Sequence, residues 1–329
     1  MHQTQEHASN QCDPRLSSFR SLRLSLTDKC NLRCIYCMPP EGVPHRTHDT
    51  LLNFETLVPI VAWLVRRTAI RRIRLTGGEP LLRKGICSAV RMLGAMEGIG
   101  ELALTTNGIL LPALAAELKQ AGLKRVNISL DTLDPDRFCE LTRGGEAHRT
   151  LAGIDAALAA GLTPVKLNCV LRRSSWRQDL PSLLDYAAGR GLEIRFIELM
   201  QTGTSSAWCD RESIAASEVW RELDLEWCAE DRAADSPARS SLVRWRGSTL
   251  HVGWITPRSH AFCNRCSRLR MDAQGRLRRC LMDDRTLPLH ELLRDEGQEA
   301  AARILVTYLQ SKKSPNAMVQ LLAMSQIGG

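Results

Sequence analysis

Residues 22–37 read LRLSLTDKCNLRCIYC, an alternating segment that runs straight into three cysteines. In its first half Leu22, Leu24 and Leu26 alternate with polar residues. Side chains alternate between the two faces of a strand, so this segment is predicted to be a strand with one apolar and one polar face. The cysteines that follow predict a metal-binding loop at the carboxyl end of that strand.

The same alternation recurs along the chain. Strands are predicted to begin near Leu22, Arg72, Leu102, Arg125, Pro164 and Glu193. Helical patterns lie between them, over residues 54–67, 111–122, 148–160 and 178–190. Such strand–helix units predict a parallel sheet with crossover helices. Parallel strands covered on both faces usually read as continuous apolar runs, so alternation indicates a curved sheet whose concave face holds a large polar ligand. An antiparallel sheet with one solvent-exposed face is the alternative.

Composition is that of a globular enzyme, with 329 residues, 44% hydrophobic and 24% charged. No run of 18 apolar residues occurs, and residues 1–11 do not resemble a signal peptide, so we expect a cytoplasmic protein. Six of the seven tryptophans follow residue 175, and residues 230–241 are predicted to be a solvated loop. Short strands are expected over 242–254 and 267–280. We therefore expect two domains, 1–209 and 210–329.

Charge and cysteine content point to the chemistry. The net charge is +8, from 44 basic and 36 acidic residues, which favours nucleotides, phosphates or nucleic acid as partners. Twelve cysteines in a chain without a secretory pattern suggest metal binding where they cluster. Six do cluster. The roles of the scattered ones stay open, although most are expected to be inert thiols: Cys12, Cys87, Cys139, Cys169, Cys209 and Cys228.

The first cysteine group is Cys30, Cys34 and Cys37, spaced C-x3-C-x2-C. Three thiolates this close can surround one metal centre. Iron–sulfur cubanes usually take four cysteines, so three leave one iron free to bind something else. A zinc site completed by His45 or His48 is the alternative.

The second cysteine group is Cys263, Cys266 and Cys280, spaced C-x2-C-x13-C. A zinc ribbon short of one ligand has similar spacing. The segment is rich in arginine, against the single acid Asp272: Arg265, Arg268, Arg270, Arg276, Arg278 and Arg279. Arg268 and Arg270 would share one face of a strand and suit phosphate oxygens. For Arg276, Arg278 and Arg279 a solvated basic face is the alternative.

The pattern C-x3-C-x-aromatic-C, with Tyr36 as the aromatic residue, resembles the signature of the radical S-adenosylmethionine (SAM) enzymes. In that superfamily the open iron chelates SAM, and an electron from the cluster releases a deoxyadenosyl radical. A longer set of motifs resembles one family, the GTP 3′,8-cyclases of molybdenum cofactor biosynthesis: IRLTGGEPLLR, LTTNG, NISLDTL, VKLN, IRFIELM, FCNRCSRLR and a final IGG.

This resemblance implies a fold and a reaction. The fold is an incomplete (βα)6 TIM-like barrel of parallel strands, with a smaller C-terminal region closing its open side. The reaction is of the lyase class. It converts GTP to (8S)-3′,8-cyclo-7,8-dihydroguanosine 5′-triphosphate and begins with removal of the hydrogen at C3′ of the ribose. The C3′ radical then attacks C8 of the guanine, and reduction of the cyclised radical gives the product. Both carbons therefore need to be held in near-attack geometry.

The resemblance also implies roles for individual residues. Each cysteine group would hold a 4Fe–4S cluster, the second binding guanine through its open iron. SAM would contact Tyr36, Gly78, Ser129 and Met200. GTP would contact Arg23, Arg74, Thr105, Lys166, Arg268 and Arg270. Arg195, Arg268 and Arg270 are the expected catalytic residues. Gly328 and Gly329 would thread into the site, a frayed terminus being the alternative.

The expected partners follow from the same resemblance. They are GTP, an external electron donor and a cyclic pyranopterin monophosphate synthase that uses the product, while a homodimer is left open. We expect no binding to nucleic acid or membranes. Two rival functions remain at this point: a peptide-modifying radical SAM maturase, and a zinc-dependent RNA-binding protein suggested by the basic C-terminal segment.

Overall fold

The computed structural model describes residues 12–43, 51–200, 206–231, 239–261 and 263–311. Several predictions concern positions outside these described residues: the terminal Gly328 and Gly329, and the zinc alternative at His45 and His48. None of the helices among the described residues is long and apolar enough to cross a bilayer.

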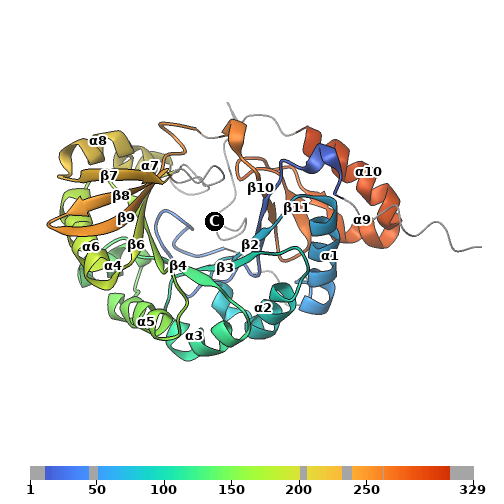
Figure 1. Cartoon of the computed structure of the whole chain (residues 1–329), viewed down its shortest axis with the longest axis horizontal. Coiled ribbons are helices and arrows are strands. Elements are labelled where there is room, and N and C mark those ends of the chain that lie inside the picture. Colours follow the sequence, from blue (N-terminus) through green and yellow to red (C-terminus); the bar gives the residue numbers. More distant parts are fainter. Residues whose placement is uncertain (1–11, 44–50, 201–205, 232–238, 262, 312–329) are drawn as a thin grey trace, which may run out of the picture.

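A single twelve-stranded sheet, which curves into a partial barrel, organises the molecule (Figure 1). Eight neighbouring strands pair in parallel, in the order β10 (Arg268–Met271), β1 (Ser21–Ser25), β2 (Arg72–Thr76), β3 (Glu101–Thr106), β4 (Arg125–Ser129), β5 (Lys166–Leu171), β6 (Glu193–Glu198) and β9 (Ser248–Ile255). The predicted parallel sheet is confirmed, and the antiparallel alternative is wrong for β1 to β6.

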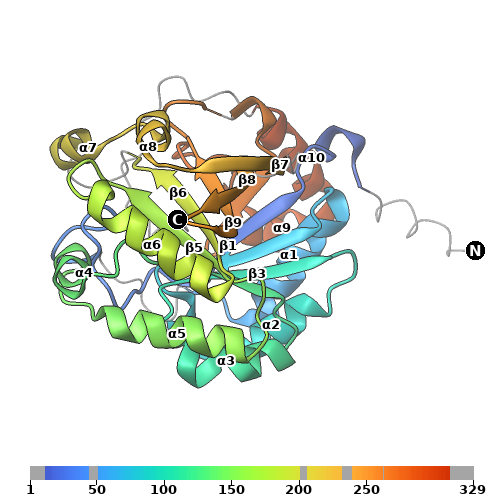
Figure 2. The same cartoon turned by 60° about the vertical axis from the view of Figure 1, so that its left-hand side comes forward.

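Helices cover the outer face of this sheet: α1 (Phe54–Arg67), α2 (Ile86–Gly94), α3 (Leu111–Gln120), α4 (Pro135–Thr142), α5 (Ala147–Ala159) and α6 (Trp176–Arg190) (Figure 2). The four helices predicted from periodicity lie within two residues of these bounds. The sequence did not predict α2 and α4, because helices of two turns hold too few apolar repeats for a clear period.

The alternation along the strands is explained by the two faces of the sheet. Leu22 and Leu24 of β1, with Ile73 and Leu75 of β2, are at most 1% exposed and belong to the core beneath the helices. The polar residues between them point to the inner face. Burial of apolar side chains under the helices fixes the strand register, because a slip of one residue would turn the arginines into the core.

The C-terminal region extends both edges of the sheet. β7 (Glu226–Asp231) and β8 (Arg239–Trp245) continue antiparallel from β9, and β11 (Arg276–Arg278) and β12 (Leu287–Pro288) continue antiparallel from β10. The predicted loop over 230–241 is therefore wrong at both ends, because strand pairing outweighs its polar composition. The remaining α-helices of the described residues are α7 (Ser206–Glu212), α8 (Ala216–Glu222), α9 (Leu289–Asp295) and α10 (Gly297–Gln310).

Candidate active site

A row of arginines crosses the inner face of the sheet. Arg23 of β1 is in register with Arg74 of β2 on one side and with Arg270 of β10 on the other. Arg195 of β6 interacts electrostatically with both Arg23 and Arg74, although β6 is five strands from β1 in the sheet. The curvature of the sheet therefore brings these cations to face one another.

These arginines repel each other on an inner face of the sheet that is largely removed from water. Burial and the neighbouring arginines lower the pKa of Arg23 and of Arg74 well below the ordinary value. The same causes lower the pKa of Arg270 to about 9 and that of Arg195 to about 10. The Nε atom of Arg74 is buried without a hydrogen-bond partner among the described residues. Such an arrangement is stabilised by a bound anion.

Two more cations on this face already have carboxylate partners. Lys166 of β5 forms an ion pair with Glu193, and Arg125 of β4 forms one with Glu101. Arg125 also donates from Nη1 to the side-chain oxygen of Asn127, at 2.9 Å. Arg125 was not among the predicted binding residues, although the alternation of β4 puts it on the same face as Asn127. Burial first, and then Arg195, lowers the pKa of Lys166.

Polar side chains continue toward the carboxyl ends of the strands. Thr105 accepts a hydrogen bond from Nδ2 of Asn127 at 3.3 Å. Ser129 is in register with Asn168, whose Oδ1 atom is buried with no partner among the described residues. Met200 follows β6 and is partly buried, with its carbonyl oxygen 3.9 Å from the Cys209 thiol.

The first cysteine group lies in the loop after β1, which is fastened to α4. The backbone N–H of Arg33 donates to Thr142 O at 3.0 Å, and that of Ile35 donates to Leu141 O at 2.9 Å. The Arg143 guanidinium donates to the Arg33 carbonyl at 2.8 Å. The three cysteines are partly buried. The loop thus holds its position through backbone contacts that do not depend on the thiols.

The turn after β2 packs directly on the chain that leads into this loop. Gly78 N–H donates to Thr27 O at 2.7 Å, and a Cβ atom at position 78 would lie 2.3 Å from Lys29 O. Glycine is required here by the approach of two backbones. Buried Glu79 accepts hydrogen bonds from Thr106 Oγ1 and Asn107 N–H, both at 2.8 Å, and burial raises its pKa to about 7.

Tyr36 is held by a carboxylate that sequence analysis did not assign. Its hydroxyl donates to Asp131 Oδ2 at 2.5 Å, and Val170 N–H donates to Asp131 Oδ1 at 2.8 Å. Burial raises the pKa of Asp131 despite these hydrogen bonds. The signal for Asp131 was available, because it lies two residues after the end of β4, at the carboxyl edge of the sheet.

The thiols of the first group suit an iron–sulfur cluster. Burial first, then Cys37, Asp131 and Cys30, raises the pKa of Cys34 well above its ordinary value. Such thiols ionise together only beside a cation, which iron supplies. Among the described residues no three His, Cys, Asp or Glu side chains converge on a single ion. A cubane does not need such convergence, since each of its irons takes one thiolate.

The second cysteine group borders the arginine row. Cys266 interacts electrostatically with Arg23 and Arg270, and Cys280 interacts with Arg270. Cys263 and Cys266 lie on a short turn in which Cys266 N–H donates to Cys263 O at 3.1 Å. The three thiols are partly buried and again offer three ligands for a cubane.

Two of the arginines beside this second group are buried rather than solvated. Arg278 is 5% exposed and Arg279 is 1% exposed. Arg276 forms an ion pair with Asp272 at 2.7 Å. Arg268, on β10, is partly buried and contributes to the lowered pKa of Arg23. The solvated alternative is therefore wrong for Arg278 and Arg279, while Arg276 is partly exposed and paired.

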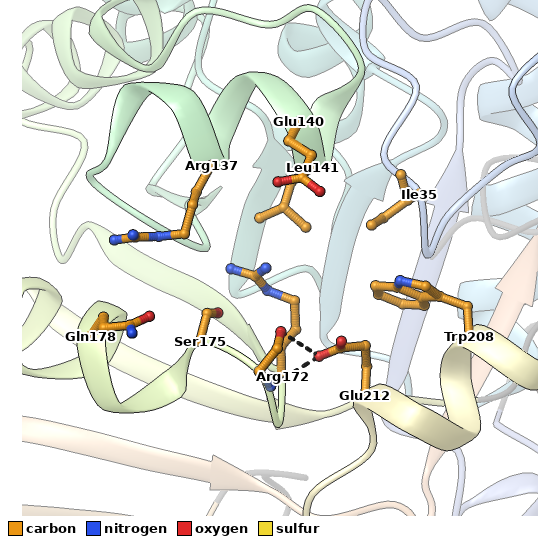
Figure 3. Close-up of a pocket in the computed structure, with 10 residues that line it drawn as sticks. Ile35, Arg137, Glu140, Leu141, Arg172, Ser175, Gln178, Trp208 and Glu212 are labelled. Carbon is orange, nitrogen blue, oxygen red and sulfur yellow. Dashed lines mark hydrogen bonds between the residues drawn. The ribbon is translucent and has the colours of Figure 1, made fainter.

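A separate pocket of about 180 Å³ lies between α4, α6 and α7 (Figure 3). Arg137 and Arg172, which line it, both bind Asp179, at 3.1 and 2.9 Å. Ile35 of the cysteine loop forms part of its wall. None of the residues predicted to bind GTP lines this pocket.

Comparison with known proteins agrees with this architecture. The family model of the radical SAM superfamily matches residues 24–187, and that of Molybdenum Cofactor Synthesis C matches residues 192–318. The crystal structure of Streptococcus suis SuiB bound to S-adenosylmethionine has a TM-score of 0.56 at 14% identity, covering 87% of this chain and 66% of that one. Fold and cysteine loop together define a radical SAM partial barrel.

Curated relatives specify the family. Those from Pelotomaculum thermopropionicum and Moorella thermoacetica, both named GTP 3′,8-cyclase, are 43% and 46% identical over 317 residues. Each alignment covers 94% of this chain and 97% of the relative. The chain therefore belongs to the GTP 3′,8-cyclase family.

Proposed function

We propose that this protein is a radical SAM enzyme that converts GTP to (8S)-3′,8-cyclo-7,8-dihydroguanosine 5′-triphosphate in molybdenum cofactor biosynthesis. The observation that carries the proposal is the arginine row of β10, β1, β2 and β6, which faces inward and borders the second cysteine group. A nucleoside triphosphate has about four negative charges and is the kind of ligand that such a row stabilises.

The proposed roles of the site residues differ between the two ends of the partial barrel. Cys30, Cys34 and Cys37 hold the cluster that binds SAM, beside Tyr36, Gly78, Ser129 and Met200. Bound there, cluster and SAM supply the carbon radical that removes hydrogen from the ribose. Cys263, Cys266 and Cys280 hold the second cluster at the guanine.

The cations position the substrate between these two ends. Arg23, Arg74, Thr105, Lys166, Arg268 and Arg270 bind GTP, and Arg195 with Arg268 and Arg270 acts at the reacting nucleotide. Ion pairs between these cations and the triphosphate fix the ribose and base in one geometry, which favours the bond between C3′ and C8 within the nucleotide. Thr105 and Lys166 are already held by Asn127 and Glu193, so their side chains are pre-oriented for binding.

The proposal implies partners and a division of the chain. An external electron donor supplies electrons for SAM cleavage and for reduction of the cyclised radical. A cyclic pyranopterin monophosphate synthase uses the product, and a second copy of the chain is a further proposed partner. We place the reaction in the cytoplasm, with domains at 1–209 and 210–329. Backbone pairing of β9 with β6 and of β10 with β1 supports a C-terminal domain that covers both edges of the barrel.

A direct assay tests the proposal. Protein reconstituted anaerobically with iron and sulfide is incubated with GTP, SAM and dithionite, and the products are separated by liquid chromatography and mass spectrometry. We expect 5′-deoxyadenosine and 3′,8-cyclo-GTP in equal amounts. Formation of deoxyadenosine without any cyclised nucleotide would reject the substrate.

The second cysteine group has its own test. Cys266→Ser is expected to keep SAM cleavage but to lose cyclisation by at least about a hundredfold, because one thiolate ligand is missing beside Arg23 and Arg270. Cys228→Ser is the matched control, since Cys228 is an exposed cysteine outside both groups. Normal cyclisation by the Cys266 variant would contradict the assignment.

A further inference from the structure

Arg279 stands directly before Cys280 and is the most deeply buried arginine of the C-terminal segment, at 1% exposure. Its Nε atom donates to Asp283 Oδ2 at 2.6 Å, within an ion pair whose two side chains are 2% and 4% exposed. A buried ion pair of this kind holds its geometry tightly, because separating the charges leaves each of them desolvated and unpaired.

The same guanidinium reaches the end of α10. Its Nη1 atom donates to the carbonyl oxygen of Tyr308 at 3.1 Å and also to the hydroxyl of Ser311. The guanidinium lies 5.0 Å from the centre of the Tyr308 ring. One side chain thus joins the segment after β11 to the C-terminal end of the last described helix.

Hydrogen bonds from side chains to backbone carbonyls close the arrangement around Cys280. The Tyr308 hydroxyl shares its proton between Arg285 O, at 2.8 Å, and Leu277 O, at 3.2 Å. Arg278 Nη1 donates to Asp283 O at 3.0 Å. The chain is therefore fixed on both sides of Cys280, while Cys263 and Cys266 come from a separate turn before β10.

We propose that Arg279 is a positioning residue for the second iron–sulfur cluster: by binding Asp283 and the end of α10, it sets the place of the Cys280 thiol relative to Cys263 and Cys266. The inference rests on the proposed function in taking Cys280 as a cluster ligand. Groups that orient metal ligands from behind commonly change metal affinity or activity by roughly 10–100-fold when removed.

The test compares Arg279→Met with Cys280→Ser in the full-length chain, after anaerobic reconstitution. Iron per chain, the electron paramagnetic resonance (EPR) spectrum of the reduced protein and SAM cleavage are measured. Arg285→Ala is the matched control, because Arg285 also donates to Asp283, at 3.1 Å, but its side chain is 65% exposed. Its contact with Tyr308 is made by its backbone carbonyl, which alanine keeps.

We expect the iron content to be about eight per chain in the wild type and about four in Arg279→Met. The EPR spectrum of Arg279→Met should match that of Cys280→Ser. SAM cleavage, which needs only the first cluster, should persist, and Arg285→Ala should match the wild type. A full iron content with the wild-type spectrum in Arg279→Met would overturn the proposal. So would loss of both clusters, or the same loss in Arg285→Ala.

The outcome is separable from that of the proposed function. Iron content and the EPR spectrum report on Cys280 ligation whether or not GTP is cyclised. A wild-type protein that holds two clusters but forms no 3′,8-cyclo-GTP would reject the substrate, and the comparison of Arg279→Met with Cys280→Ser would still decide the role of Arg279.

Discussion

Arg74 is a residue whose charge we expect to destabilise the free protein. Its guanidinium is partly buried, its Nε atom has no partner among the described residues, and Arg23, Arg125 and Arg195 repel it. Residues of this kind are common at binding sites, where electrostatic strain in the free protein is relieved by the ligand. Gly78 shows a different constraint at the same scale, since its missing side chain lets two backbones meet.

Replacing Arg74 by methionine is expected to affect stability and binding in opposite directions. Without ligand, the free energy of unfolding in urea should rise by about 1 kcal/mol, because a partly buried charge that its neighbouring arginines repel is removed. GTP affinity, measured by calorimetry, should fall by roughly 10–100-fold. Arg66→Met, on the exposed face of α1, is the control and should change neither quantity appreciably. Unchanged GTP affinity in Arg74→Met would remove Arg74 from the binding site.

Substituting alanine for Gly78 should disturb the first cysteine loop. The new Cβ would lie 2.3 Å from Lys29 O and 2.7 Å from Asp28 O, both backbone atoms, so one chain has to move. We expect a loss of about 3 kcal/mol in unfolding free energy and weaker iron binding by the first group. Gly189→Ala in α6 meets no atom within 4 Å and should stabilise by about 0.5 kcal/mol. Equal stabilities of the two variants would refute this steric explanation.

Among the elements, the end of β6 connects the barrel with the C-terminal region. Glu198, 1% exposed, accepts backbone hydrogen bonds from Ala216 at 3.0 Å, Arg258 at 3.0 Å and Ser259 at 2.9 Å. One carboxylate thus fixes both the start of α8 and the segment between β9 and the second cysteine group. Burial raises the pKa of Glu198, but the hydrogen bond from the Ser259 hydroxyl and these three backbone hydrogen bonds outweigh burial and lower the pKa overall.

Stability should therefore depend on Glu198 in a pH-dependent way. Because the folded pKa lies below the ordinary value of 4.5, the contribution is present above that pH and is lost as the pH falls through the folded pKa. At pH 7, Glu198→Gln should lower the unfolding free energy by about 3 kcal/mol, since an amide offers one acceptor oxygen instead of two. The difference should shrink in acid. A constant difference from pH 7 to pH 3 in urea titrations would contradict this role.

Over the whole molecule, the sheet gathers positive charge on its inner face from strands that are far apart in sequence. Arg270 and Arg23 are adjacent across the β10–β1 pairing, although almost 250 residues separate them in the chain. Like charges collected in this way make the stability of the free protein sensitive to polyanions and to salt.

GTP should consequently stabilise the whole fold more than guanosine does. At a hundredfold excess over its dissociation constant, a ligand adds about 2.7 kcal/mol, which corresponds to a rise of roughly 5 °C in melting temperature for a chain of this size. Guanosine at the same concentration should give a much smaller shift, and added salt should reduce the shift with GTP. Equal shifts for both ligands, measured by differential scanning fluorimetry, would argue against triphosphate binding by the arginines.

The sequence by itself determined the faces of the strands, the parallel order of β1 to β6 and the residues available for chemistry. Alternation has a period of two residues, so Leu22 and Arg23 are predicted to lie on opposite faces of the strand without any tertiary information. The two cysteine groups could also be recognised from short stretches of sequence, because the spacing of the cysteines within each stretch is enough to suggest a metal site. Motif resemblance then predicted the family that the comparisons support.

Only the tertiary structure decided which of these residues meet. It placed Arg195 opposite Arg23, joined Tyr36 to Asp131, and turned Arg279 from a candidate surface charge into a buried partner of Asp283. It also made strands of both ends of the polar segment 230–241. The physical reason is the same in each case: curvature, strand pairing and burial depend on contacts between distant segments, and no short window of sequence contains both partners.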